Sequence, residues 1–356
     1  MNYRITGTGS CIPDITKNNS DFLKNKFLDL DGNNIQNSNA EIIEKFKSIT
    51  GIVERRYAPD EINSSDLAAV AASVAIKDSK LNKETLDYII VAHNTGDISC
   101  KSGQVDTLPS IASKVKAKLK IKNPYCVAYD IICGCPGWVE GVIQAKSFIK
   151  SGMAKKCLVI GCDTLSRILD ENDRDSMIYA DGAGAIILES DSSYDGGILS
   201  HKSATFTYDG ENDFIFFGTS YDTKAKAKSD QKFIKMQGRK VYEFALSKVP
   251  DAMKKCFDAS GHQIKSLKKI FIHQANQKMD EAIVKRFYKL YNLKVPENVL
   301  PMNIEKFGNS STATIPTLLD LVIKKKYKGH EINKGDIILF ASVGAGMNIN
   351  AVSYQY

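Results

Sequence analysis

The sequence contains no long hydrophobic run. Its apolar stretches, such as residues 157–160, are short, whereas a helix that spans a bilayer needs about 20 apolar residues. No basic segment followed by an apolar stretch opens the chain, so we expect no signal peptide. Hydrophobic residues make up 43% of the 356 residues, and charges of both signs are mixed throughout. This composition is typical of a globular protein, and we expect a cytoplasmic one without a membrane partner.

The cysteines lack the spacing of a metal site. The sequence has no pair of Cys-x-x-Cys motifs, and a single residue separates Cys133 from Cys135, which is unfavourable for a tetrahedral zinc site. We therefore expect no metal. Cys126, Cys157 and Cys162 lie in apolar, strand-like segments, where cysteine packs as a small hydrophobic residue.

Basic stripes with interleaved aromatic residues are also missing. The chain has 48 Lys and Arg residues against 41 Asp and Glu residues, a formal charge of +7. The cluster at residues 324–328 precedes Gly329 and is typical of a solvated helix end. The polar, lysine-rich segment 218–232 predicts an exposed loop. We expect no nucleic-acid partner.

An internal repeat relates the two halves of the chain. Residues 86–91 and 267–272 are similar apolar segments, and each follows a helix-like stretch. Residues 157–161 and 337–341 form a second similar pair. Both pairs are offset by about 180 residues, so their equal spacing indicates a duplication.

Short apolar strands that alternate with helical segments predict an α/β fold with sheets covered on both faces. The turn-rich stretch 194–197 places the boundary between an N-terminal half, residues 1–195, and a C-terminal half, residues 196–356. The helix around residues 66–72 is apolar on nearly all sides, so we expect it to be buried, with buried helices between the two sheets.

Cys135 is a candidate nucleophile. An apolar strand leads into Cys133-Gly134-Cys135-Pro136, and a helical pattern follows. Pro136 suits the first helical position, so Cys135 is predicted at the helix N-cap on a sharp turn that Gly134 permits. The free N–H groups and the dipole there favour a thiolate with a lowered pKa. A structural cysteine in a strand–helix turn fits these residues equally well.

The second half supplies candidate partners for a cysteine nucleophile. His273 ends an apolar strand, and Asn309 lies in a small polar segment that opens a helix, where it fits a helix N-cap as well. Residues 344–346 form a glycine-rich turn after a buried strand, which leaves backbone N–H groups free. A histidine and backbone donors of this kind suit acyl chemistry on a cysteine.

Several short motifs follow one another along the chain. They are Gly7-Thr8-Gly9, Thr50-Gly51-Ile52, Glu54-Arg55-Arg56, the Cys135 turn, Asp181-Gly182-Ala183-Gly184-Ala185, Met236-Gln237-Gly238-Arg239, His273-Gln274-Ala275-Asn276, Gly308-Asn309-Ser310-Ser311 and Gly344-Ala345-Gly346. Together they resemble the β-ketoacyl-acyl carrier protein synthase III family of the thiolase superfamily. The resemblance implies the thiolase fold, a duplicated five-layer αβαβα arrangement, usually in a homodimer.

The resemblance also implies the site. Cys135 carries the acyl group, and the backbone N–H groups of Cys135 and Ala345 form the oxyanion hole. His273 and Asn309 hold the thioester oxygen of a malonyl-type extender during its decarboxylation. The reaction is then a decarboxylative Claisen condensation with coenzyme A or acyl carrier protein thioesters as substrates and no further cofactor. Two neutral donors beside the developing charge lower the barrier without moving a proton.

The family docks acyl carrier protein on basic residues after the histidine. Lys278, Lys285 and Arg286 hold the matching places, and their spacing keeps them near one helix face. Such charges speed the encounter with an acidic partner. A solvated helix face explains the same residues equally well.

Some positions depart from the family pattern. Members that start from acetyl-coenzyme A carry Trp and Arg where this chain has Lys45 and Ile49. The single tryptophan, Trp138, lies beside the nucleophile, and Leu108 replaces a bulky aromatic residue that limits chain length from across the dimer. We therefore expect Leu108 and Trp138 at the acyl pocket, and a donor that is not restricted to acetyl-coenzyme A.

Other activities fit the same residues. Specialised members of the family make resorcinol- or quinolone-type lipids or transfer acyl groups to oxygen. An inactive partner subunit of a heterodimeric synthase is a non-enzymatic alternative, which the presence of Cys135, His273 and Asn309 disfavours. A 3-hydroxy-3-methylglutaryl-coenzyme A synthase needs a glutamate after the strand that ends near Val91, where this chain has residues 93–95, His-Asn-Thr.

Overall fold

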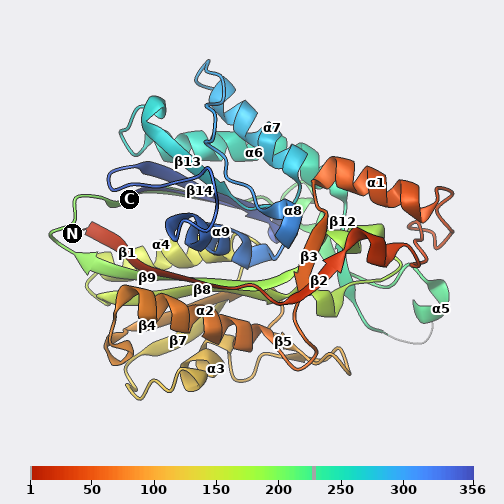
Figure 1. Cartoon of the computed structure of the whole chain (residues 1–356), viewed down its shortest axis with the longest axis horizontal. Coiled ribbons are helices and arrows are strands. Elements are labelled where there is room, and N and C mark those ends of the chain that lie inside the picture. Colours follow the sequence, from red (N-terminus) through yellow and green to blue (C-terminus); the bar gives the residue numbers. More distant parts are fainter. Residues whose placement is uncertain (1, 227–229) are drawn as a thin grey trace.

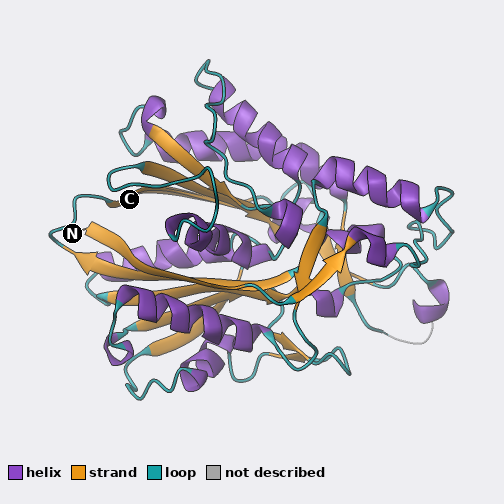
Figure 2. Ribbon diagram, in the orientation of Figure 1, coloured by secondary structure: helices purple, strands orange, loops and turns teal. Residues whose placement is uncertain are grey.

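The structure is a computed structural model that describes residues 2–226 and 230–356. Within these residues, two main β-sheets lie one above the other, and helices fill the space between them and cover both outer faces (Figure 1). Helices and strands thus alternate as α, β, α, β and α layers (Figure 2). The N- and C-termini lie near each other at one end of the molecule (Figure 1).

The first sheet comes from the described part of the first half. Its order is β1 (Asn2–Cys11), β9 (Asp181–Asp191), β8 (Lys156–Thr164), β4 (Tyr88–His93) and β7 (Val127–Ile132). Strand β4 runs parallel to both β7 and β8, while β9 is antiparallel to β8 and β1. The three parallel strands therefore end at the same edge of the sheet.

The second sheet comes from the described part of the second half. Its order is β10 (Gly197–Thr205), β15 (Asn348–Gln355), β14 (Ile337–Gly344) and β13 (Leu267–Ile272). Strand β13 is parallel to β14, as β4 is to β8. The repeated segments found in the sequence thus occupy equivalent strands of the two sheets.

The helices form three layers. The outer layer on the first sheet holds α2 (Ser64–Ser79) and α3 (Ile111–Lys118), the central layer holds α4 (Gly137–Lys150) and α9 (Thr314–Ile323), and the outer layer on the second sheet holds α6 (Gly238–Asp258) and α7 (Gln277–Lys289). Trp138, Val142 and Leu318 of the central helices pack between Val159 of one sheet and Phe340 of the other. This shared core fixes the two halves against each other.

The expected burial of the helix around residues 66–72 holds for one of its faces only. Helix α2, which contains residues 66–72, lies on the outer face of the first sheet and not between the sheets. It buries Ala68, Ala71 and Ala75 against that sheet, but Val70 is 51% exposed. A helix that is apolar on nearly all sides therefore need not be fully enclosed, since one face with Leu67 and small alanines makes the sheet contact.

Smaller elements surround the ends of the two sheets. They are the strand pairs β2 (Ile15–Asn18) with β3 (Glu54–Tyr57), β5 (Asp97–Ile98) with β6 (Val105–Asp106) and β11 (Ile215–Gly218) with β12 (Phe233–Met236), and the helices α1 (Asn39–Thr50), α5 (Thr223–Lys226) and α8 (Ile304–Phe307). Ser38 and Glu41 form a reciprocal capping box that starts α1. Helix α5 lies in the predicted loop 218–232, of which residues 227–229 fall outside the described residues.

No helix in the described part of the chain combines the length and the apolar character needed to cross a membrane.

Candidate active site

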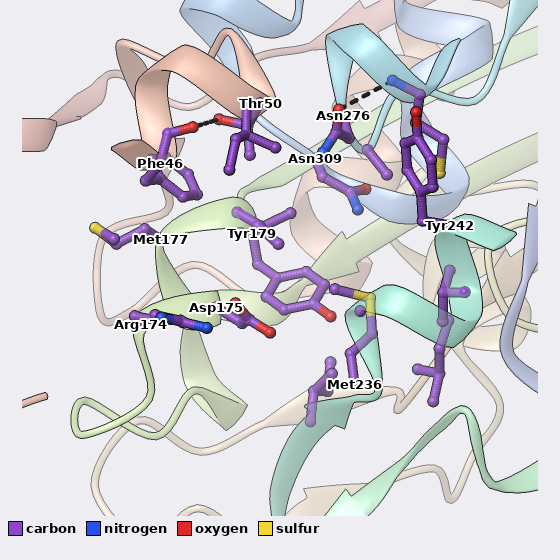
Figure 3. Close-up of a pocket in the computed structure, with 18 of the residues that line it drawn as sticks. Phe46, Thr50, Arg174, Asp175, Met177, Tyr179, Met236, Tyr242, Asn276 and Asn309 are labelled. Carbon is purple, nitrogen blue, oxygen red and sulfur yellow. Dashed lines mark hydrogen bonds between the residues drawn. The ribbon is translucent and has the colours of Figure 1, made fainter. Parts of the chain in front are cut away.

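A cavity of about 390 Å³ lies where the parallel strands of both sheets end. Among its lining residues, Asn94 follows β4, Cys135 follows β7, Leu165 follows β8, His273 follows β13 and Ala345 follows β14. Helix α1 and the 3₁₀ helix η4 (Arg174–Ile178) supply further wall residues, including Phe46, Thr50, Asp175 and Met177 (Figure 3). The duplicated fold therefore brings residues far apart in sequence to one cavity.

Cys135 lies on the turn between β7 and α4. Gly134 has φ +61°, a left-handed conformation that favours glycine, and its carbonyl accepts a hydrogen bond from Gly137 N–H. Pro136, rather than Cys135, is the N-cap residue, so α4 begins one residue later than the sequence predicts. Assignments of helix ends commonly differ by one residue, and the sharp turn is as expected.

The ionisation of Cys135 differs from the expectation. Burial raises the pKa of its thiol to about 12, whereas the helix N-terminus alone predicts a lowered value. A hydrogen bond from the Ser311 hydroxyl acts in the opposite direction and lowers the pKa, while the nearby Asp163 carboxylate raises it. The resting state is therefore the thiol, and the site must stabilise the thiolate when it forms.

Two backbone segments meet beside the sulfur. A Cβ atom added to Gly344 would lie 2.7 Å from the Cys135 backbone nitrogen, and one added to Gly134 would lie 2.9 Å from the Ala345 nitrogen. Glycine at these two places lets the Cys135 turn approach the turn after β14. The two turns that carry the N–H groups predicted to form an oxyanion hole are therefore in close contact.

His273 reaches the cavity from the end of β13. Its backbone N–H donates to Ala341 on the neighbouring β14, which fixes the position of the residue. Burial lowers the pKa of the imidazole to about 4, so the ring is neutral near pH 7. Its Nδ1 lies 2.8 Å from the Thr314 hydroxyl oxygen, which leaves Nε2 for the cavity. The Thr314 hydroxyl has a single hydrogen and also contacts the Ser311 carbonyl at 3.0 Å. The ring proton therefore sits on Nε2, where it can be donated to a substrate, only when that hydrogen turns from the carbonyl to Nδ1.

Asn309 is fixed by both its backbone and its side chain. Its backbone N–H donates to Ile178, and its carbonyl accepts from Ala180, so it lies beside Tyr179 (Figure 3). The Oδ1 atom accepts a 2.8 Å hydrogen bond from Ser311 N–H. This contact orients the amide so that its Nδ2 donor is the group left for the cavity.

Comparison with known proteins identifies the family. The profiles of 3-oxoacyl-[acyl-carrier-protein (ACP)] synthase III and of its C-terminal domain match residues 129–206 and 257–356. A β-ketoacyl-[acyl-carrier-protein] synthase III of Porphyra purpurea is 32% identical over the full length of both chains. The chain belongs to the 3-oxoacyl-[acyl-carrier-protein] synthase III family. A Vibrio vulnificus relative of the same enzyme name is 33% identical over 97% of both chains.

Solved structures of the family share the fold. The Aquifex aeolicus synthase III is 28% identical and superposes with a TM-score of 0.80 over 99% of this chain and all of its own. The Thermus thermophilus enzyme is 27% identical, with a TM-score of 0.81 over 99% of this chain and 98% of its own. These comparisons confirm the predicted family and the predicted thiolase fold. They also confirm that the protein is an acyltransferase of the condensing-enzyme class.

The predicted pocket residues lie outside this cavity. The Trp138 ring packs edge-to-face on Phe340, 5.6 Å away in the core between the sheets, and does not line the cavity as expected. Its position on the inner face of α4 turns it away from the turn that carries Cys135. Leu108 is 88% exposed on the loop that follows β6 and also lies outside the cavity of the single chain.

The predicted docking residues lie on α7 but do not share one environment. Lys278 and Lys285 are exposed. Arg286 is also exposed, but its guanidinium donates to the Leu246 carbonyl on α6, so it points toward that helix. The helical spacing explains this difference. Residues 278 and 285 are nearly two full turns apart and so share one face of α7, whereas residue 286 is about 100° further round the helix.

Ser311, Asn94 and Asp163 make contacts at the site that the sequence did not predict. Ser311 belongs to the motif that contains Asn309, and its small polar side chain in that motif is the one feature of the sequence that could have indicated a role at the site. Asn94 and Asp163 follow or end buried strands, where polar residues are uncommon. Their mutual hydrogen bonds are visible only in the folded chain.

Proposed function

We propose that this condensing enzyme loads an acyl group on Cys135 and joins it to a malonyl-type extender bound at His273 and Asn309. The observation that carries the proposal is the meeting of these three side chains, from separate elements, at one cavity. The family relationship supports the same assignment. The neutral histidine and the oriented amide supply the donors that such chemistry requires.

In the first half-reaction, the Cys135 thiol loses its proton and the sulfur attacks the carbonyl carbon of a thioester. The carbonyl oxygen becomes an oxyanion, which accepts hydrogen bonds from the backbone N–H groups of Cys135 and Ala345. The carbonyl then re-forms, the carbon–sulfur bond to the donor breaks, and the departing thiolate takes up one proton, which balances the proton lost by Cys135. The close approach of the two turns at Gly134 and Gly344 supports this role.

In the second half-reaction, the carboxylate of the malonyl-type thioester leaves as carbon dioxide. The electron pair moves onto the thioester oxygen as an enolate, which accepts hydrogen bonds from His273 Nε2–H and Asn309 Nδ2–H. The enolate carbon attacks the acyl carbonyl, and the Cys135 thiolate leaves and is reprotonated. The protein and the thioesters supply the reacting groups of this sequence, and the proton that the Cys135 thiolate takes up comes from solvent.

We further propose a donor other than acetyl-coenzyme A, presented by acyl carrier protein. Lys45 and Ile49, which replace the nucleotide-holding pair of the family, line the cavity on α1 together with the acidic Glu41. The α1 side of the cavity thus combines opposite charges instead of an aromatic and an arginine. The exposed Lys278 and Lys285 on α7 suit an acidic carrier protein, and Arg286 adds charge near α6.

The proposed assembly is a homodimer. Strand β7 is at the edge of the first sheet, and Val127 and Ile132 on it are 47% and 68% exposed. In such a dimer Leu108 covers the acyl pocket of the partner, which accounts for its exposure in one chain. Each chain consists of the halves 1–195 and 196–356. A cytoplasmic location suits the eight free cysteines, because thiols stay reduced there.

Intact mass spectrometry tests the proposed function. The protein is incubated with a panel of acyl-coenzyme A and acyl-carrier thioesters, and we expect one acyl adduct on the wild type and none on Cys135→Ala. Carbon dioxide release from malonyl-carrier protein then separates decarboxylative condensation from simple transfer to oxygen. An adduct that persists in Cys135→Ala contradicts the nucleophile, and rapid labelling by acetyl-coenzyme A alone contradicts the proposed donor.

A further inference from the structure

Ser311 contacts two of the proposed catalytic side chains directly, Asn309 and Cys135, and is linked to the third, His273, through Thr314. It begins the 3₁₀ helix η7 (Ser311–Ala313), is 2% exposed and has φ +51°. Its N–H donates to Asn309 Oδ1 at 2.8 Å, and its hydroxyl donates to Cys135 Sγ at 3.3 Å. Its carbonyl accepts from the Thr314 hydroxyl at 3.0 Å, and that hydroxyl also contacts His273. A left-handed φ is unfavourable for serine, so the surrounding contacts must hold it there.

The direction of the Ser311 hydroxyl is set by Asn94. Asn94 Nδ2 donates to Ser311 Oγ at 2.7 Å and to Asp163 Oδ2 at 2.8 Å, and the Asn94 backbone N–H donates to Asp163 Oδ1 at 2.8 Å. A serine hydroxyl has one hydrogen. Since the Asn94 amide already donates to the Ser311 oxygen, the Ser311 hydrogen is free to point at the sulfur.

Asp163 anchors this arrangement from β8. Its carboxylate also accepts hydrogen bonds from the Thr312 hydroxyl and backbone N–H. Asp163 is 1% exposed, and its donors satisfy the buried charge. The order of hydrogen bonds is therefore fixed from the carboxylate through the amide and the hydroxyl to the nucleophile, and we call it the Asp163–Asn94–Ser311 chain.

We propose that Ser311 is a catalytic residue that stabilises the Cys135 thiolate by donating a hydrogen bond to its sulfur, and that Asn94 is the positioning residue that keeps this donor aimed. The inference rests on the proposed function, in which Cys135 is the nucleophile. Among the described residues, Ser311 provides the side-chain hydrogen bond to that sulfur. A donor to the charged form favours that form.

The same hydrogen bond serves both half-reactions. During loading, it stabilises the sulfur as the proton leaves and the attack on the thioester begins. During condensation, the carbon–sulfur bond breaks and the electron pair returns to the sulfur, which again becomes a thiolate beside the hydroxyl. Because burial opposes charge on this sulfur, a fixed donor in a water-poor site has a larger effect than it has in water.

The experiment compares the alkylation of Cys135 by iodoacetamide in the wild type and in Ser311→Ala, between pH 7 and 10. Peptide mass spectrometry follows each cysteine, with the exposed Cys100 as internal reference and the buried Cys162 as a marker of unfolding. We expect the Cys135 rate to fall about tenfold throughout this range, relative to Cys100, because a hydrogen bond to a charged group is lost.

The sign of the change separates the proposed role from a structural one. A loosened site exposes Cys135, returns its pKa toward about 8.5 and speeds alkylation, whereas loss of the donor slows it. Ser310→Ala is the matched control, because the Ser310 hydroxyl is outside the Asp163–Asn94–Ser311 chain and makes no capping hydrogen bond, and we expect its rate to equal that of the wild type.

Asn94→Ala supplies an independent test, since it frees the Ser311 hydroxyl to rotate without removing it. We expect a slower Cys135 rate than in the wild type but a faster one than in Ser311→Ala. An unchanged or faster rate in both variants overturns the inference. If instead Cys135 accepts no acyl group from any thioester while the alkylation differences persist, the proposed function fails and the hydrogen-bond role stands.

Discussion

A single methyl group added at Gly344 perturbs the site through the backbone alone. Gly344 has φ −170°, an extended conformation that alanine also adopts, so Gly344→Ala introduces no left-handed strain. The added Cβ would lie 2.7 Å from the Cys135 nitrogen, 2.7 Å from Pro136 Cδ and 2.9 Å from Cys135 Cβ. All three atoms belong to the turn that presents the nucleophile.

The size of the effect follows from these distances. An ordinary contact begins near 3.4 Å, so the turn after β14 and the Cys135 turn must separate by about 0.7 Å. A displacement approaching 1 Å at reacting groups costs about a hundredfold in rate. We expect acylation of Cys135 to slow about a hundredfold, equivalent to about 2.7 kcal/mol at the transition state. Overpacking of this kind also costs about 1–3 kcal/mol of stability.

Rapid-quench intact mass spectrometry measures the acylation rate of Gly344→Ala with the thioester that loads the wild type best. Gly261→Ala is the control for a general loss of stability. Gly261 has φ +75°, which is unfavourable for alanine, but a Cβ there meets no atom within 4 Å. This control loses about 1–2 kcal/mol of stability through its backbone but leaves the site in place. Acylation of Gly344→Ala at the wild-type rate would refute the close approach of the two turns as the basis of the oxyanion hole.

Four further predictions address other parts of the site. His273→Ala should lose about a thousandfold in carbon dioxide release from malonyl-carrier protein yet still form the acyl adduct, which intact mass detects; equal loss of both steps contradicts the division of roles. Because burial raises the pKa of Cys135 to about 12, its alkylation rate should rise about tenfold per pH unit from pH 7 to 9, and a plateau near pH 8.5 contradicts that pKa. Arg55→Met should lower the free energy of unfolding by about 3 kcal/mol in denaturant titration, since the fully buried guanidinium donates to three oxygens; a change under about 1 kcal/mol contradicts this. Lys285→Gln should raise the KM for carrier protein more than Arg286→Gln does, with the difference shrinking in high salt, because Arg286 points toward α6; the reverse order contradicts the proposed docking face.

Each of the proposed catalytic side chains carries a local signal in the sequence. Pro136 and Gly134 mark a sharp strand–helix turn around Cys135, and His273 and Asn309 follow apolar strand and glycine signals. Local signals say nothing about the partners that act across the fold. The predicted thiolate was wrong for this reason, since the burial that raises the pKa of Cys135 comes from distant segments.

The pocket residues show the same division. Trp138 is adjacent to the nucleophile in sequence, but the helical rotation of α4 directs its ring into the core against Phe340. Asn94 and Ser311 are 217 residues apart and meet because β4 and the start of α9 converge at the same sheet edge. Proximity in sequence therefore gave a wrong prediction for Trp138 and gave no prediction for Asn94 and Ser311.

By itself, the sequence determined the α/β class, the duplication and the family, and it indicated the proposed nucleophile and its partners, because periodicity, turn residues and motif order are encoded locally. The tertiary structure alone decided which layer each helix occupies, the charge state of Cys135 and His273, and the Asp163–Asn94–Ser311 chain. These properties depend on burial and on hydrogen bonds between residues distant in sequence, and both arise only when the two sheets pack on their shared helices.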